Sequence, residues 1–238
     1  MIDEGNLKNY LTYAIGEILL VMIGILLALQ VNNWNTNRIN QQLEKKILKQ
    51  LHSEFQQNKF NFEKVTSLRL SNLESCNRII EMFPIDLEKL NLDSLSWYLK
   101  HTGYRGTFNP SNGAINALVS SSSFDIISNE QLRSILIQWK DLVADYLEDE
   151  AITDYHLVNY WDPYMNTSLL QRLDQKPKIE TIYDKRTDLS FLTAIEFENL
   201  VIRRKLNLRR IVSPGDEVSE LEMIKNAIDT ILELSKNH

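Results

Sequence analysis

The longest hydrophobic stretch of the chain runs from Leu11 to Val31 and reads LTYAIGEILLVMIGILLALQV, with a single charged residue. At a rise of about 1.5 Å per residue, a helix of this length spans roughly the 30 Å hydrocarbon core of a bilayer. Tyr13 near one end and Trp34 beyond the other are residues that prefer the membrane interface. The pattern predicts an uncleaved membrane-spanning helix over residues 11–31, after a short tail of residues 1–10.

Beyond this segment, hydrophobic residues recur every three or four positions from Ile39 to Phe83. This spacing makes one face of an α-helix apolar. Pro84 ends the pattern, because proline lacks the backbone N–H and its ring clashes inside a helix. We therefore expect a long helix over residues 32–84 that continues the membrane-spanning helix. Because the spacing drifts between three and four, a helix of a bundle is favoured over a coiled coil.

The remaining residues, 85–238, are expected to form a helical domain that packs on this long helix. Only seven Gly and five Pro are present to build the turns of an all-β fold, so the chain is predicted to be all-α. Ser128 and Gln131 have the spacing of a capping box at the start of a helix. Amphipathic stretches predict helices over 86–101, 128–160, 164–173, 188–212 and 216–236, with a break at Asp162-Pro163, a polar loop over 174–188 and a turn at Ser213-Pro214-Gly215.

The clearest irregular segment is HTGYRGTFNPSNG, residues 101–113, which contains three of the seven glycines and one proline. Such a segment is a connector between helices or a recognition loop, and the connector is favoured. If the loop binds a partner, Tyr104, Arg105 and Phe108 are the residues expected to make the contacts.

The single acid of the hydrophobic segment, Glu17, is its most informative residue. A turn of about 100° per residue places Val21, Gly24, Ala28 and Asn35 within about 40° of Glu17 on one helix face. Gly24 and Ala28 form a small-x-x-x-small pair, which lets two membrane helices approach closely. Because an ionisable group in a membrane span normally faces protein or water, this face predicts contact with another copy or another membrane protein. The alternative is that Glu17 lies at a shallow depth in the membrane and needs no protein neighbour.

Two charged clusters are candidate chemical sites. A divalent metal could bind acids and a histidine on one predicted helix, but their spacing lacks the Glu-x-x-His pattern of di-iron bundles, so a solvated acidic face is favoured. This acidic cluster comprises Asp145, Glu148, Asp149, Glu150, Asp154 and His156. The second cluster is basic and comprises Arg203, Arg204, Lys205, Arg209 and Arg210. It could bind lipid or nucleic acid, but a solvated helix face that pairs with acidic side chains is favoured. We predict no metal site and no cofactor.

Composition narrows the function classes further. The formal net charge of -6 gives no general electrostatic basis for binding nucleic acid. The lone cysteine, Cys76, cannot form an intrachain disulfide. His52, His101, His156 and the serines 120–123 lack the strand-turn-helix context of nucleophilic catalysis, so no catalytic activity is predicted.

Residues 13–35, YAIGEILLVMIGILLALQVNNWN, resemble the N-terminal signature of an uncharacterised bacterial family of single-span membrane proteins, a domain of unknown function. NPSNGA at 109–114 and ISN at 127–129 are similar to that family's middle segment. The resemblance implies a protein of the bacterial inner membrane with its soluble domain in the periplasm. One basic residue precedes the span and three follow it closely. Because basic residues are enriched on the cytoplasmic side of a span, this count favours the opposite orientation, with the soluble domain in the cytoplasm.

These features together predict a membrane-anchored, self-associating interaction or scaffold protein of the bacterial envelope, without catalytic activity. Its expected partners are membrane lipid and either further copies of itself or another membrane protein. One alternative is an oligomeric pore in which Glu17 lines the ion path. A further alternative is a ligand-sensing domain that transmits strain through the long helix.

Overall fold

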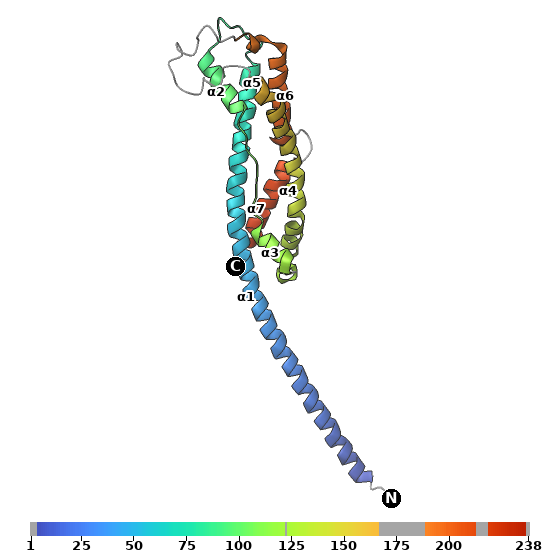
Figure 1. Cartoon of the computed structure of the whole chain (residues 1–238). Helices are drawn as coiled ribbons and strands as arrows, with labels where there is room; N and C mark the ends of the chain where they lie inside the picture. The colour runs from blue at the N-terminus through green and yellow to red at the C-terminus, as the bar shows by residue number, and fades with distance from the viewer. Residues whose placement is uncertain (1–3, 122, 167–188, 213–218, 237–238) are drawn as a thin grey trace.

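The protein is described here by a computed structural model that covers residues 4–121, 123–166, 189–212 and 219–236. Within these ranges every regular element is a helix and no strand is present, which confirms the predicted all-α fold. Helix α1, Glu4–Ile80, is 77 residues long and projects far out of a bundle formed by the other helices (Figure 1). At about 1.5 Å per residue it is roughly 115 Å in length.

The unbroken course of α1 confirms that the hydrophobic segment continues directly into the bundle. No proline occurs before Pro84, so no backbone N–H is missing from the hydrogen-bond ladder of this helix. The helix ends at Ile80, four residues earlier than the sequence suggested. Its last turn tightens, with the Met82 N–H donating to the Ile79 carbonyl at 3.0 Å, because a residue that precedes proline is disfavoured in the α conformation.

The bundle contains six further α-helices in the described residues. They are α2 Leu92–Thr102, α3 Gly113–Ser121, α4 Glu130–His156, α5 Asp162–Asn166, α6 Ile195–Val212 and α7 Glu220–Ser235. Short 3-10 turns lie at Phe124–Ile126 and Ser190–Thr193. The predicted helix at 86–101 was therefore placed too early, because Asn91 caps α2 by accepting the Ser94 N–H at 3.0 Å. The segments 174–188 and 213–215, and the end of the predicted helix 164–173, lie outside the described residues.

Two predictions about α4 were wrong in detail. Its N-cap is Asn129, whose side chain accepts the Leu132 N–H at 2.9 Å, whereas the Ser128 N–H and hydroxyl both donate to Glu44 on α1. The predicted break at Pro163 is also absent, because α4 passes through the π-helical turn Leu157–Trp161 into α5. Pro163 follows directly on this turn, where the Asp162 N–H donates to the Leu157 carbonyl five residues back, so the ordinary i→i−4 hydrogen-bond pattern is already interrupted beside the proline.

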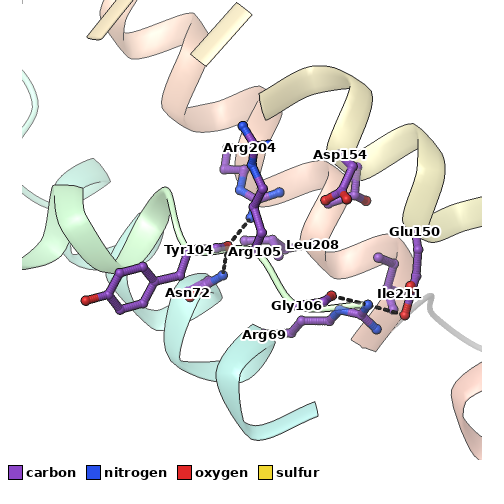
Figure 2. A pocket seen from close by; sticks show the side chains of 11 residues that line it. Arg69, Asn72, Tyr104, Arg105, Gly106, Glu150, Asp154, Arg204, Leu208 and Ile211 are labelled. Atoms are coloured by element: carbon purple, nitrogen blue, oxygen red, sulfur yellow. Dashed lines mark hydrogen bonds and ion pairs between the residues drawn. The ribbon is translucent and has the colours of Figure 1, made fainter. Parts of the chain in front are cut away.

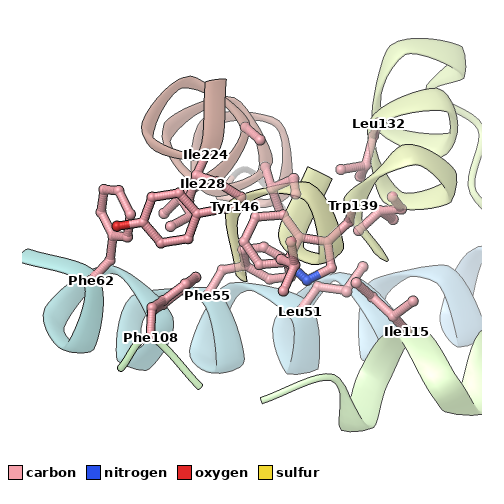
Figure 3. Packing of buried hydrophobic residues seen from close by; sticks show 14 of the residues in the cluster. Leu51, Phe55, Phe62, Phe108, Ile115, Leu132, Trp139, Tyr146, Ile224 and Ile228 are labelled. Atoms are coloured by element: carbon pink, nitrogen blue, oxygen red, sulfur yellow. The ribbon is translucent and has the colours of Figure 1, made fainter. Parts of the chain in front are cut away.

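The hydrophobic core forms two clusters along the upper half of α1. One lies between α1, α3, α4 and α7 and contains edge-on aromatic rings, with the ring centres of Phe55 and Trp139 4.9 Å apart (Figure 3). The other lies nearer the far end, where α1 meets α2, the π-helical turn and α6, and it includes Cys76. Helix α1 contributes to both clusters and packs against α2, α3, α6 and α7.

The lower part of α1 packs on no other element in the described chain. From Tyr13 onward the first buried residue of α1 is Leu48. This helix carries the one stretch of the described residues that is long and apolar enough to cross a membrane. The bundle reaches down α1 to Glu44, which is 13 residues or roughly 20 Å beyond Val31. A bare helical stalk therefore separates the apolar segment from the bundle.

Candidate functional site

The helix face that contains Glu17 lies on the continuous, exposed part of α1. Glu17, Val21, Gly24, Ala28 and Asn35 are all exposed on the isolated chain. Beyond its own stretch of helix backbone, a Cβ atom added to Gly24 would meet no atom of this chain within 4 Å. The helical geometry on which the shared face depends is therefore present, and room for a neighbouring helix is available at Gly24.

The loop between α2 and α3, residues 103–112, is irregular as predicted, but its side chains are not all available to a partner. Phe108 is 0% exposed and lies in the core, its ring centre 5.1 Å from that of Phe62. It therefore cannot act as the surface contact that the sequence suggested. Tyr104 and Arg105 do lie at the surface, and Arg105 forms an ion pair with Asp162 at the start of α5.

Polar side chains of α1 and α4 hold the second half of this loop. The Asn58 amide makes two hydrogen bonds with the backbone of Ser111, donating to its carbonyl at 2.9 Å and accepting its N–H at 2.8 Å. Glu54 accepts the Ala114 N–H at 3.0 Å. The Trp139 indole donates to Asn112 at 2.7 Å. An irregular backbone pressed against a core needs such partners for its polar groups.

A buried ion pair holds the middle of the loop. Arg69 on α1 and Glu150 on α4 are each 4% exposed and contact each other directly. Arg69 also donates to the Gly106 carbonyl at 2.8 Å and to the Tyr146 hydroxyl, while Glu150 accepts the Phe108 N–H at 3.0 Å. Glu150 was expected on a solvated acidic face, and that prediction was wrong because it pairs with an arginine from a distant part of the chain.

The electrostatics of this pair follow from its burial. Desolvation raises the pKa of Glu150 above its ordinary value, and the neighbouring Arg69 opposes that rise. Desolvation also raises the pKa of the Tyr146 hydroxyl to about 12. The tyrosine is therefore neutral at physiological pH and acts as a hydrogen-bond acceptor for Arg69.

A second buried arginine holds the start of the loop. Arg204 on α6 is 1% exposed and donates to the carbonyls of Thr102 and Tyr104 at 3.1 and 3.3 Å. Asn72 on α1 donates to the same Tyr104 carbonyl at 2.8 Å (Figure 2). Desolvation lowers the pKa of Arg204 to about 10. Arg204 thus does not belong to a solvated basic face, whereas Arg210 of the same cluster is exposed and forms an ion pair with the partly buried Asp149 at 2.6 Å.

These contacts define a polar clamp, by which we mean Asn58, Arg69, Asn72, Glu150 and Arg204 around the 103–112 loop. The clamp fixes backbone rather than presenting free reactive groups. In the described ranges, no group of three His, Cys, Asp or Glu side chains is placed to hold a metal ion. The acidic cluster is divided by the fold, with Glu150 and His156 buried and Glu148 at the surface.

A signal for the clamp was present in the sequence of α1. Its buried positions lie three, four or seven residues apart along one face, apart from Ser75 beside Cys76, and they are Leu48, Leu51, Phe55, Asn58, Phe62, Arg69, Asn72, Ser75, Cys76 and Ile79. Four of these residues are polar. Because buried polar side chains need partners, polar residues on an apolar stripe indicate a hydrogen-bonding site.

Comparison with known proteins identifies the family and gives no activity. No curated protein and no solved structure matches the chain. Residues 17–149 match a family model, and this range contains the Glu17 face, the 103–112 loop and the α1 side of the clamp. Since it covers more than half of the 238 residues, the chain belongs to the Family of unknown function (DUF6090).

Proposed function

We propose that this protein is a membrane-anchored, self-associating interaction protein of the bacterial envelope, without catalytic activity. Residues 11–31 are its anchor in the inner membrane, and the bundle lies in the periplasm, where it contacts other envelope proteins. Nucleic acid is not among its proposed partners, in keeping with the net charge of -6.

The observation that carries this proposal is the continuity of α1. One unbroken helix connects the apolar segment to both core clusters. Such a connection suits a protein that holds a domain at a fixed height above a membrane. The bare stalk between Val31 and Glu44 sets that height at roughly 20 Å.

Self-association is supported by the chemistry of the Glu17 face. A carboxyl group in hydrocarbon costs about 2.5–3.5 kcal/mol near the centre of a span, and contact with protein or water reduces that cost. Gly24 and Ala28 lie on the same face and let a second helix approach. Because this part of α1 packs on no other described element, the neighbouring helix would come from another chain.

The absence of catalysis is proposed because the three charged side chains of the polar clamp hold backbone. Arg69, Glu150 and Arg204 all bind the backbone of the 103–112 loop or the carbonyl of Thr102 just before it. Each of these three side chains is at most 4% exposed. A catalytic group must reach its substrate, and these groups do not.

Chemical crosslinking of the full chain in mild detergent tests the proposal. Discrete multimers are expected for the unaltered chain, and Gly24→Leu or Glu17→Leu should weaken them. Gly16→Leu is the matched control, because Gly16 lies about 100° around the helix from Glu17 and, like Gly24, has open space beside it. A monomer at every protein concentration, or equal loss with Gly16→Leu and Gly24→Leu, would contradict self-association through this face.

A further inference from the structure

Two polar atoms near the start of the 103–112 loop are buried without a hydrogen-bond partner among the described residues. They are Oδ1 of Asn72 and Nη1 of Arg204. Both residues are 1% exposed, so bulk water does not solvate them. Nearly all buried polar atoms in folded proteins have a protein or water partner, which makes two unpartnered atoms in one place informative.

The two atoms belong to neighbouring side chains that line one cavity. The Asn72 amide and the Arg204 guanidinium both donate to the Tyr104 carbonyl oxygen, at 2.8 and 3.3 Å (Figure 2). Asp154 lines the same cavity from α4. The unpartnered acceptor and the unpartnered donor therefore belong to two side chains that share one backbone oxygen.

The size and polarity of the cavity select its occupant. The space that the centre of a water molecule can occupy is about 10 Å³, which is close to the least that holds one water. The lining carries charges of both signs, so an anion would face the carboxylates of Glu150 and Asp154, and a cation would face the guanidinium groups of Arg69, Arg105 and Arg204. A neutral molecule that both donates and accepts a hydrogen bond satisfies both orphan atoms.

We propose that this cavity is the binding site of a single internal water molecule that joins Asn72 of α1 to Arg204 of α6. The water accepts a hydrogen bond from Nη1 of Arg204 and donates one to Oδ1 of Asn72. It completes the polar clamp at Tyr104, because two side chains that already share a carbonyl oxygen then become linked to each other. This site is independent of self-association and of the membrane segment.

Oxygen-17 relaxation dispersion of water, measured on the full chain in detergent, counts internal waters of long residence. Asn72→Leu is expected to lose one such water, whereas Asn72→Asp, which retains an acceptor oxygen, is expected to keep it. Ser75→Ala is the control, because Ser75 is buried on the same helix with its hydroxyl bonded to the Ser71 carbonyl at 2.8 Å. An equal count in the unaltered chain and in folded Asn72→Leu would overturn the proposal.

A crystal structure of the unaltered full chain, grown with bromide, keeps the proposal testable if Asn72→Leu does not fold. One water within hydrogen-bonding distance of both Oδ1 of Asn72 and Nη1 of Arg204 is the expected result. An anomalous bromide peak in the cavity would overturn it in favour of an anion. Direct contact between the two orphan atoms and protein groups would overturn it in favour of a closed cavity.

Discussion

Removing one partner of the buried pair between Arg69 and Glu150 should destabilise the bundle strongly. In Glu150→Leu the guanidinium stays buried at 4% exposure without its carboxylate, and the Phe108 N–H loses its acceptor. Breaking a buried ion pair from one side costs about 3–5 kcal/mol, because an uncompensated charge remains. Glu150→Gln should cost less, since an amide oxygen still accepts the Phe108 N–H.

The double variant Arg69→Met/Glu150→Leu separates the charge effect from the loss of shape. With both charges removed, the remaining cost is that of unpaired groups in the loop, chiefly the Phe108 N–H and the Gly106 carbonyl, at about 1–3 kcal/mol each. We therefore expect the double variant to cost less than the sum of the two single variants, by several kcal/mol in the free energy of unfolding.

Urea unfolding of the full chain in mild detergent, followed by tryptophan fluorescence, measures these costs, because Trp139 and Trp161 are buried in the two core clusters. Additive losses would refute the reasoning, since they would mean that Arg69 and Glu150 do not share an energetic interaction. Single variants that each cost less than about 1 kcal/mol would refute it too, because such small losses belong to exposed ion pairs.

Three further predictions concern other parts of the chain. Asn129→Ala should lower the free energy of unfolding by about 1 kcal/mol in urea, because it removes the N-cap of α4. Desolvation, and then the charge of Arg204, lower the pKa of His156 from 6.5 to about 4. The unfolded chain therefore binds a proton that the folded chain does not, so stability should fall as the pH drops from 6.5 towards 4, and folded His156→Leu should show a shallower fall in the same unfolding assay. Glu17→Gln should leave ion flux through liposomes unchanged and at background, and a flux that depends on Glu17 would favour a pore instead.

Most of the helices were predictable from the sequence because their signals are local, whereas the short α3 was missed. Three- and four-residue spacing marked α1, α4, α6 and α7, and the composition marked an all-α fold. The predicted helix boundaries differ from the observed ones by several residues where a side-chain cap sets the start of the helix, as Asn91 does for α2. Pro163 misled the prediction because a π-helical turn lets the chain continue through it.

The polar clamp was not predictable in the same way because its partners are far apart in the sequence. Arg69 and Glu150 are separated by 81 positions, and Arg204 and Thr102 by 102. Spacing along one helix shows which face is buried but not which residue of another helix meets it. Charged residues such as Glu150 and Arg204 are therefore assigned to solvent by default, and only the packed bundle shows that they are enclosed.

Resonance energy transfer between labelled copies of the full chain in liposomes tests the central claim of self-association most directly. The account predicts transfer above the level of random encounters for the unaltered chain and for Gly16→Leu, a decrease on dilution with lipid, and a clear loss in Gly24→Leu. Transfer at the random level for the unaltered chain at every lipid ratio would contradict it, and only a monomeric anchor for the bundle would remain.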